Sequence, residues 1–240
     1  MSILFIVIIA GVSLLVFFLV GCQQQTKKPD PPEPEPTPKL PKIEIAEDGL
    51  SLVRKNTYSE SRVIRWPNNV FSIYNATGSE QQHQWLQDAL ITWNRLMPNT
   101  TFVVASEEPA WATVTYNPDI YDFRDANGRL LRAAGLCYVH FRNFEIYKVK
   151  IELLPTGQYP GRYYEESAHV IAHELGHGIG FRAHTSDPAC VMNCQPGNLY
   201  PGDEATLTVR TMYALNPGSA LFRGAAALRG DGEVVLVDEV

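Results

Sequence analysis

The pattern with the clearest chemistry in this 240-residue chain is a pair of histidines four residues apart, with a glutamate beside the first. These residues are His173, Glu174 and His177. Residues i and i+4 of a helix share a face, so both imidazoles can bind one ion, and this pattern is typical of zinc sites. Glu174 stands where a carboxylate can hold and deprotonate a water at the metal. The sequence therefore predicts a zinc site with a general base.

A third protein ligand is expected, because catalytic zinc keeps three protein ligands and one open position. Gly180 follows His177 by three residues, and its tolerance of positive φ allows the helix to end in a sharp turn. His184 comes four residues later and is the candidate for the third ligand. Asp187 is the alternative, since carboxylates also bind zinc.

The spacing resembles the signature of the metzincin metallopeptidases, HExxHxxGxxH followed by a methionine turn. It departs from that signature at one point: three residues, Phe181 to Ala183, separate Gly180 from the next histidine where the signature has two. The third-ligand position therefore falls on Ala183, which cannot bind zinc.

The segment 184–193 nevertheless resembles the matrixin version of the stretch between third ligand and methionine turn. This resemblance implies that His184 is the third ligand, with Asp187 as the substitute, because aspartate takes that place in some small metzincins. It also implies that Met192 supports the ligands from below without binding the metal.

Hydrophobic periodicity predicts the elements that must position these residues. A core-packed helix is expected over Ser167 to Ile179, with its histidines facing a cleft. A longer helix begins at the cap residue Ser79, with Gln82 in the capping-box position, and runs to Pro98. A last helix is expected over Asp203 to Leu215. Strands are predicted at 70–74, 101–105, 112–116, 135–141 and 148–153.

This order of elements is similar to that of a metzincin. The resemblance implies an α+β fold with a twisted, mixed five-stranded sheet, a long backing helix, an active-site helix and a small C-terminal subdomain after the zinc helix. It also implies that an extended substrate adds as a strand along the edge presented by Gly135 to Phe141. Residues 193–200 would then wall the pocket for the side chain after the cut.

The N-terminus resembles that of a bacterial lipoprotein. Residues 3–20 are almost wholly apolar, although no Lys or Arg precedes the run. The run ends in Leu19-Val20-Gly21-Cys22, a lipobox-like stretch. We expect a signal peptide over 1–21 and a lipidated Cys22; an uncleaved membrane anchor is the alternative. The expected location is the bacterial cell envelope, on a membrane and facing the periplasm or exterior.

Residues 22–42 form the expected tether, with seven prolines between Pro29 and Pro41. The catalytic domain is expected over 43–217, and residues 218–240 form a tail to which the sequence assigns no role. The net charge of −6 and the lack of basic runs give no support to nucleic-acid binding.

Three cysteines besides Cys22 allow at most one intramolecular disulfide in an oxidising compartment. Cys190 with Cys194 would hold the methionine turn, and Cys137 with either of them is also open. No cysteine lies in 43–61, so the cysteine-switch propeptide of many matrixins is not expected.

The sequence favours a zinc-dependent endopeptidase that acts on proteins or peptides outside the membrane. Two alternatives stay open. One is a zinc-bearing surface lipoprotein without catalysis, such as an adhesin or binding module, although a structural site does not need Glu174. The other is a peptidoglycan hydrolase, which the matrixin-like spacing disfavours.

Overall fold

The computed structural model divides the chain into two compact units, residues 1–42 and 43–240. It describes residues 47–97, 99–122, 124, 128, 133–155, 168–194, 198–221 and 232–237. The predicted signal peptide, Cys22 and the tether lie outside the described residues. Among the helices described, none is both long and apolar enough to cross a bilayer.

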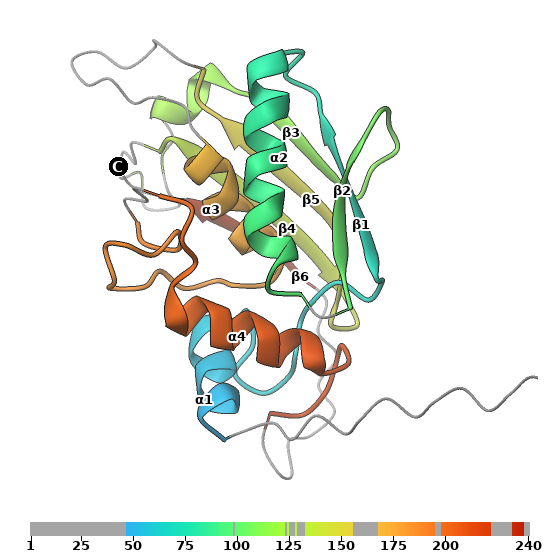
Figure 1. Cartoon of the computed structure of the whole chain (residues 1–240), viewed down its shortest axis with the longest axis vertical. Coiled ribbons are helices and arrows are strands. Elements are labelled where there is room, and N and C mark those ends of the chain that lie inside the picture. Colours follow the sequence, from blue (N-terminus) through green and yellow to red (C-terminus); the bar gives the residue numbers. More distant parts are fainter. Residues whose placement is uncertain are drawn as a thin grey trace, which may run out of the picture. The chain divides into compact units, whose positions relative to one another are not determined.

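One mixed sheet forms the centre of the second unit, in the order β2-β1-β3-β5-β4-β6 (Figure 1). The five predicted strands are all present, and a sixth joins them. Neighbours from β2 to β5 run parallel, whereas β4 is antiparallel to both β5 and β6. The strands are β1 (Val70–Asn75), β2 (Thr101–Ala105), β3 (Ala112–Tyr116), β4 (Gly135–Arg142), β5 (Glu145–Leu153) and β6 (Gly232–Val237).

The sixth strand comes from the C-terminal tail and corrects one expectation. β6 pairs with β4 from Leu136 opposite Val237 to Phe141 opposite Gly232. The edge predicted to be open for substrate is therefore occupied. This strand could not be predicted, because a short apolar run can be a strand or a buried segment, and this run lies beyond the part of the chain that resembles a known family.

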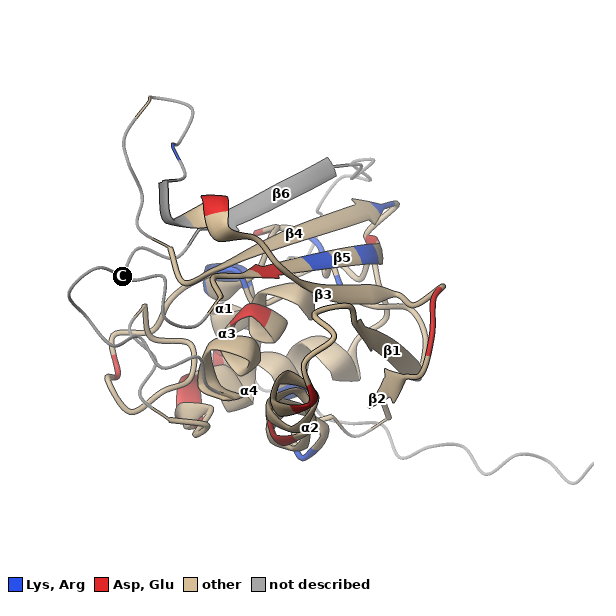
Figure 2. Cartoon of the chain, turned by 90° about the horizontal axis from the view of Figure 1, so that it is seen from above, with Lys and Arg blue, Asp and Glu red and all other residues tan. Residues whose placement is uncertain are grey.

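Two helices cover one face of the sheet, α2 (Glu80–Asn94) and α3 (Ala168–Gly178) (Figure 2). The Ser79 side chain caps α2 by accepting a hydrogen bond from the Gln82 amide, as predicted. The helix ends at Asn94, earlier than the predicted stop at Pro98. Trp93 joins α2 to α3: it is fully buried, and its indole donates to the Ala172 carbonyl at 2.7 Å.

A smaller layer lies beside this body, formed by α1 (Glu47–Asn56) and α4 (Gly202–Ala214). The sequence predicted α4 to within one residue at each end but did not predict α1. The helices approach closely at Gly49, where a Cβ would lie 2.4 Å from the Thr211 hydroxyl. After α4 the chain returns to the body, where the Gly218 amide donates to the Val63 carbonyl and Leu221 is buried in the core.

Candidate metal centre

Three histidines converge where α3 meets the loop that follows it. The Nε2 atoms of His173 and His177 lie 3.1 Å apart, and those of His177 and His184 lie 3.3 Å apart. The helical pair is buried and His184 is exposed. These three residues form a group able to hold a metal ion, so the structure brings together the set predicted from the sequence.

Backbone carbonyls fix the tautomer of the two helical histidines. Nδ1 of His173 lies 2.6 Å from the Val191 carbonyl, and Nδ1 of His177 lies 2.8 Å from the Phe181 carbonyl. A carbonyl oxygen can only accept, so each Nδ1 carries a proton, and in the neutral ring each Nε2 then presents a lone pair. This is the arrangement that a metal-ligating histidine requires.

These lone pairs fit a cation. Two unprotonated Nε2 atoms 3.1 Å apart cannot hydrogen-bond each other, and a cation between them would remove their repulsion. Tetrahedral coordination with Zn–N distances of about 2.0–2.1 Å places ligand nitrogens about 3.3–3.4 Å apart. The two separations that involve His177, 3.1 and 3.3 Å, are close to that spacing, and all three ligand atoms lie within 4.8 Å of one another. Imidazole nitrogens suit zinc among several transition metals.

The end of α3 has the turn that Gly180 was predicted to make. The Phe181 amide donates to the Gly176 carbonyl, and the Gly180 amide donates to the His177 carbonyl, which together form a Schellman motif. Gly180 has φ +114°, and a Cβ there would lie 2.8 Å from the Ile64 carbonyl. The turn therefore requires glycine, and it also aims the Phe181 carbonyl at His177.

Aromatic side chains bond the carbonyls at the C-terminal end of α3 and of the residue just after it, which have no partner within the helix. The Tyr58 hydroxyl donates to His177, and the Trp66 indole donates to Gly178, each at 2.9 Å. The Tyr213 hydroxyl donates to Ile179, also at 2.9 Å. These donors come from separate segments and hold the metal-site helix rigidly, yet the sequence pattern did not identify them.

The loop carrying His184 is attached to α1 through Asn56. The Asn56 carbonyl accepts from the amides of Arg182 and Ala183, at 2.7 and 3.2 Å. Its side-chain amide donates to Glu204 and Thr208 of α4. The extra residue before His184 therefore lies in a segment whose backbone amides bond Asn56. This anchoring explains how His184 reaches the other two histidines despite the longer spacing.

Asp187 is not in the histidine group. Its side-chain oxygen accepts from the Ala189 amide at 2.9 Å, as in an Asx turn. Of the two candidates for the third ligand, the geometry brings His184 to the other histidines.

The turn containing Met192 lies beneath the metal-site helix. Met192 is fully buried, its carbonyl accepts from the Thr185 amide, and its neighbour Val191 provides the carbonyl that orients His173. Cys190 bonds the Pro201 carbonyl through its thiol, and burial raises the pKa of that thiol. None of Cys137, Cys190 and Cys194 is in a disulfide.

Glu174, the predicted general base, follows His173 on α3 and is 1% exposed. Its carboxylate lies against the first residue of β4: a Cβ on Gly135 would come within 2.3 Å of the Glu174 Oε1 atom. Because Gly135 has no side chain, the Glu174 carboxylate can occupy this space. This contact brings the first residue of β4 to Glu174 on the helix that carries His173 and His177.

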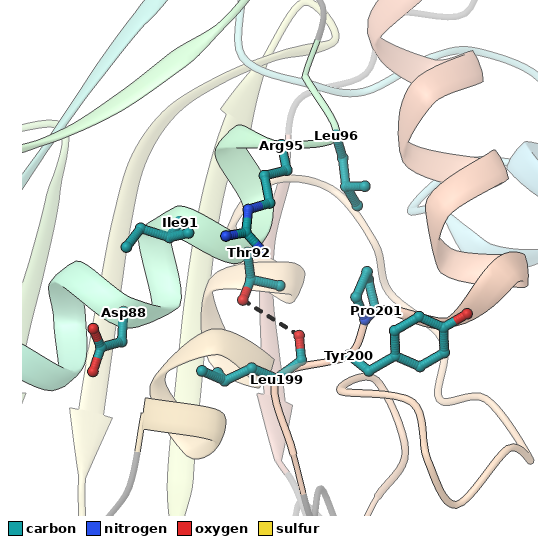
Figure 3. A pocket seen from close by; sticks show the side chains of 8 residues that line it. All are labelled: Asp88, Ile91, Thr92, Arg95, Leu96, Leu199, Tyr200 and Pro201. Atoms are coloured by element: carbon teal, nitrogen blue, oxygen red, sulfur yellow. Dashed lines mark hydrogen bonds between the residues drawn. The ribbon is translucent and has the colours of Figure 1, made fainter.

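Leu199 and Tyr200, at the end of the segment predicted to wall a substrate pocket, face α2 (Figure 3). Leu199 and Tyr200 line a cavity of about 470 Å³, and the Thr92 hydroxyl donates to the Leu199 carbonyl. None of the metal-site histidines lines this cavity.

Comparisons of the sequence with models of known families and with curated proteins find no match to this chain. The site geometry is therefore the basis for assigning a function.

Proposed function

We propose that the protein is a zinc-dependent endopeptidase of matrixin-like metzincin type, which hydrolyses peptide bonds of proteins or peptides outside a bacterial membrane. One observation carries the proposal: three imidazoles converge, and the residue after the first of them on α3, Glu174, is a buried carboxylate. A structural site has no use for that carboxylate. The lipobox-like stretch at Cys22 supports a lipoprotein location.

His173, His177 and His184 would hold the ion. Bound zinc with an open position polarises a carbonyl and lowers the pKa of water. Glu174 takes the proton of the attacking water and then delivers it to the leaving amine, so one carboxylate acts first as base and then as acid. Because Glu174 is buried, few water molecules compete for its proton.

The test is cleavage of a broad peptide library by the purified full chain, with and without a chelator, together with Glu174→Gln. The substitution preserves size but removes the basic carboxylate. We expect bound zinc to remain and cleavage to fall by at least about a hundredfold. Glu107→Gln is the matched control, because Glu107 is exposed and distant in sequence from Glu174. This variant should cleave peptides at the rate of the unmodified protein.

Two results would contradict the proposal. Protein that holds zinc but cuts no peptide would favour the alternative of a non-catalytic, zinc-bearing surface lipoprotein. Unchanged cleavage by Glu174→Gln would place the general base elsewhere.

A further inference from the structure

The tail strand β6 occupies the one edge of the sheet that lies beside the metal centre. Six consecutive residue pairs, from Leu136–Val237 to Phe141–Gly232, align the two strands in antiparallel register. The opposite edge of the sheet, β2, lies four strands from β4. β6 is therefore placed where an added extended segment would meet the site.

The direction of β6 leads its chain toward the catalytic carboxylate. Its last residue, Val237, is opposite Leu136. The next residue of β4 in that direction is Gly135, which lies against Glu174. β4 also runs beside α3, since a Cβ on Gly178 would be 3.7 Å from the Cys137 sulfur. An extended chain on this edge thus passes along the metal-site helix toward Glu174.

Extended peptides bind exposed sheet edges by strand addition, which satisfies their backbone groups and those of the edge. Two strands cannot use the same edge of β4 at once. We propose that β6 is an internal competitor: it covers the position of an extended substrate and restrains cleavage until it leaves. This inference rests on the proposed peptidase function and adds its regulation.

Displacement of β6 is physically reasonable because the strand is an outer one. β6 is held to the sheet through β4, and within the described residues no further strand pairs with its other side. Edge elements with one neighbour open at lower free energy than central ones. The remaining five strands keep the order β2-β1-β3-β5-β4 without it, with α2 and α3 on their face.

Competition by an intramolecular strand has a defined kinetic signature. Substrate binds only the fraction of molecules with an open edge, so the apparent KM is raised by the inverse of that fraction, while kcat is unchanged. A chain that ends at Leu221 retains the buried Leu221 side chain but lacks β6. We expect its KM for an extended peptide to be lower by at least about tenfold.

A pair of proline variants provides a matched control within the full chain. Neighbouring N–H groups of a strand point to opposite sides, so one of Val234→Pro and Val235→Pro removes an N–H directed at β4, and the other removes one directed away. The variant that loses the N–H directed at β4 should lower KM as truncation does. The variant that loses the N–H directed away from β4 should have a KM closer to that of the unmodified protein. A synthetic peptide of residues 231–240 should inhibit the shortened chain competitively, and its reversed sequence should not.

Hydrogen exchange of the β4 amides and zinc content are measured on the same samples. We expect faster exchange over 136–141 in the shortened chain, with equal zinc. Equal KM values together with newly exchanging β4 amides would overturn the inference and leave the peptidase proposal intact. Equal β4 exchange in both chains would show that β6 does not cover the edge. If no form cuts peptides while all hold zinc, the peptidase function itself fails, and the inference fails with it. Should the shortened chain not fold, the proline pair decides.

Discussion

The Met192 side chain occupies the space that a side chain on Gly176 would need. A Cβ built on Gly176 would lie 2.2 Å from the Met192 sulfur and 2.8 Å from the Trp93 ring. The glycine between the two helical histidines thus allows the methionine turn to contact the metal-site helix directly. That turn carries the Val191 carbonyl to His173.

Gly176→Ala should therefore destabilise the protein, even though alanine favours a helix by about 1 kcal/mol over glycine. We expect overpacking to lower the free energy of unfolding by about 1–3 kcal/mol. Gly178→Ala is the control, because its Cβ would meet a valine methyl group at 3.0 Å, which can shift. Denaturant unfolding of both variants measures the difference, and equal stability would contradict the close contact seen here.

His184→Ala should sharply reduce the amount of metal that the purified protein holds, since two protein ligands make a weak site. Asp187→Ala should keep the metal content of the unmodified protein, because Asp187 bonds its own turn. Metal analysis of the purified variants distinguishes them. The opposite pattern would make Asp187 the ligand.

Asn56→Ala should lower stability by about 1–3 kcal/mol, because its buried side chain bonds both Glu204 and Thr208. Lys55→Ala removes an exposed bond to the same Glu204 oxygen and should cost less than about 1 kcal/mol. Thermal unfolding compares the two. If the losses are similar, α1 is not held to α4 through Asn56.

Cys22→Ser should abolish lipidation and signal-peptide cleavage if the N-terminus is that of a lipoprotein. Incorporation of labelled fatty acid and the mass of the mature chain provide the readout. Equal labelling of both forms, or labelling of neither, would favour an uncleaved anchor.

Local patterns predicted the elements with strong signals. The histidine spacing located α3 and its three-residue group, and the Ser79 cap began α2 correctly. Long-range partners could not be predicted, because the donors Tyr58, Trp66 and Tyr213 reach α3 from distant segments. The polar helix α1 and the tail strand β6 were not predicted either, since their formation depends on tertiary packing rather than on local periodicity.

The carbonyls that hold the Nδ1 protons of His173 and His177 have a thermodynamic consequence. Both rings lose their rotational freedom when the chain folds, so the ion need not order them again. An ion held by these rings would therefore bind the folded chain far better than the unfolded chain, and it would shift the folding equilibrium by mass action. Removal of the ion by a chelator should therefore lower the melting temperature of the protein.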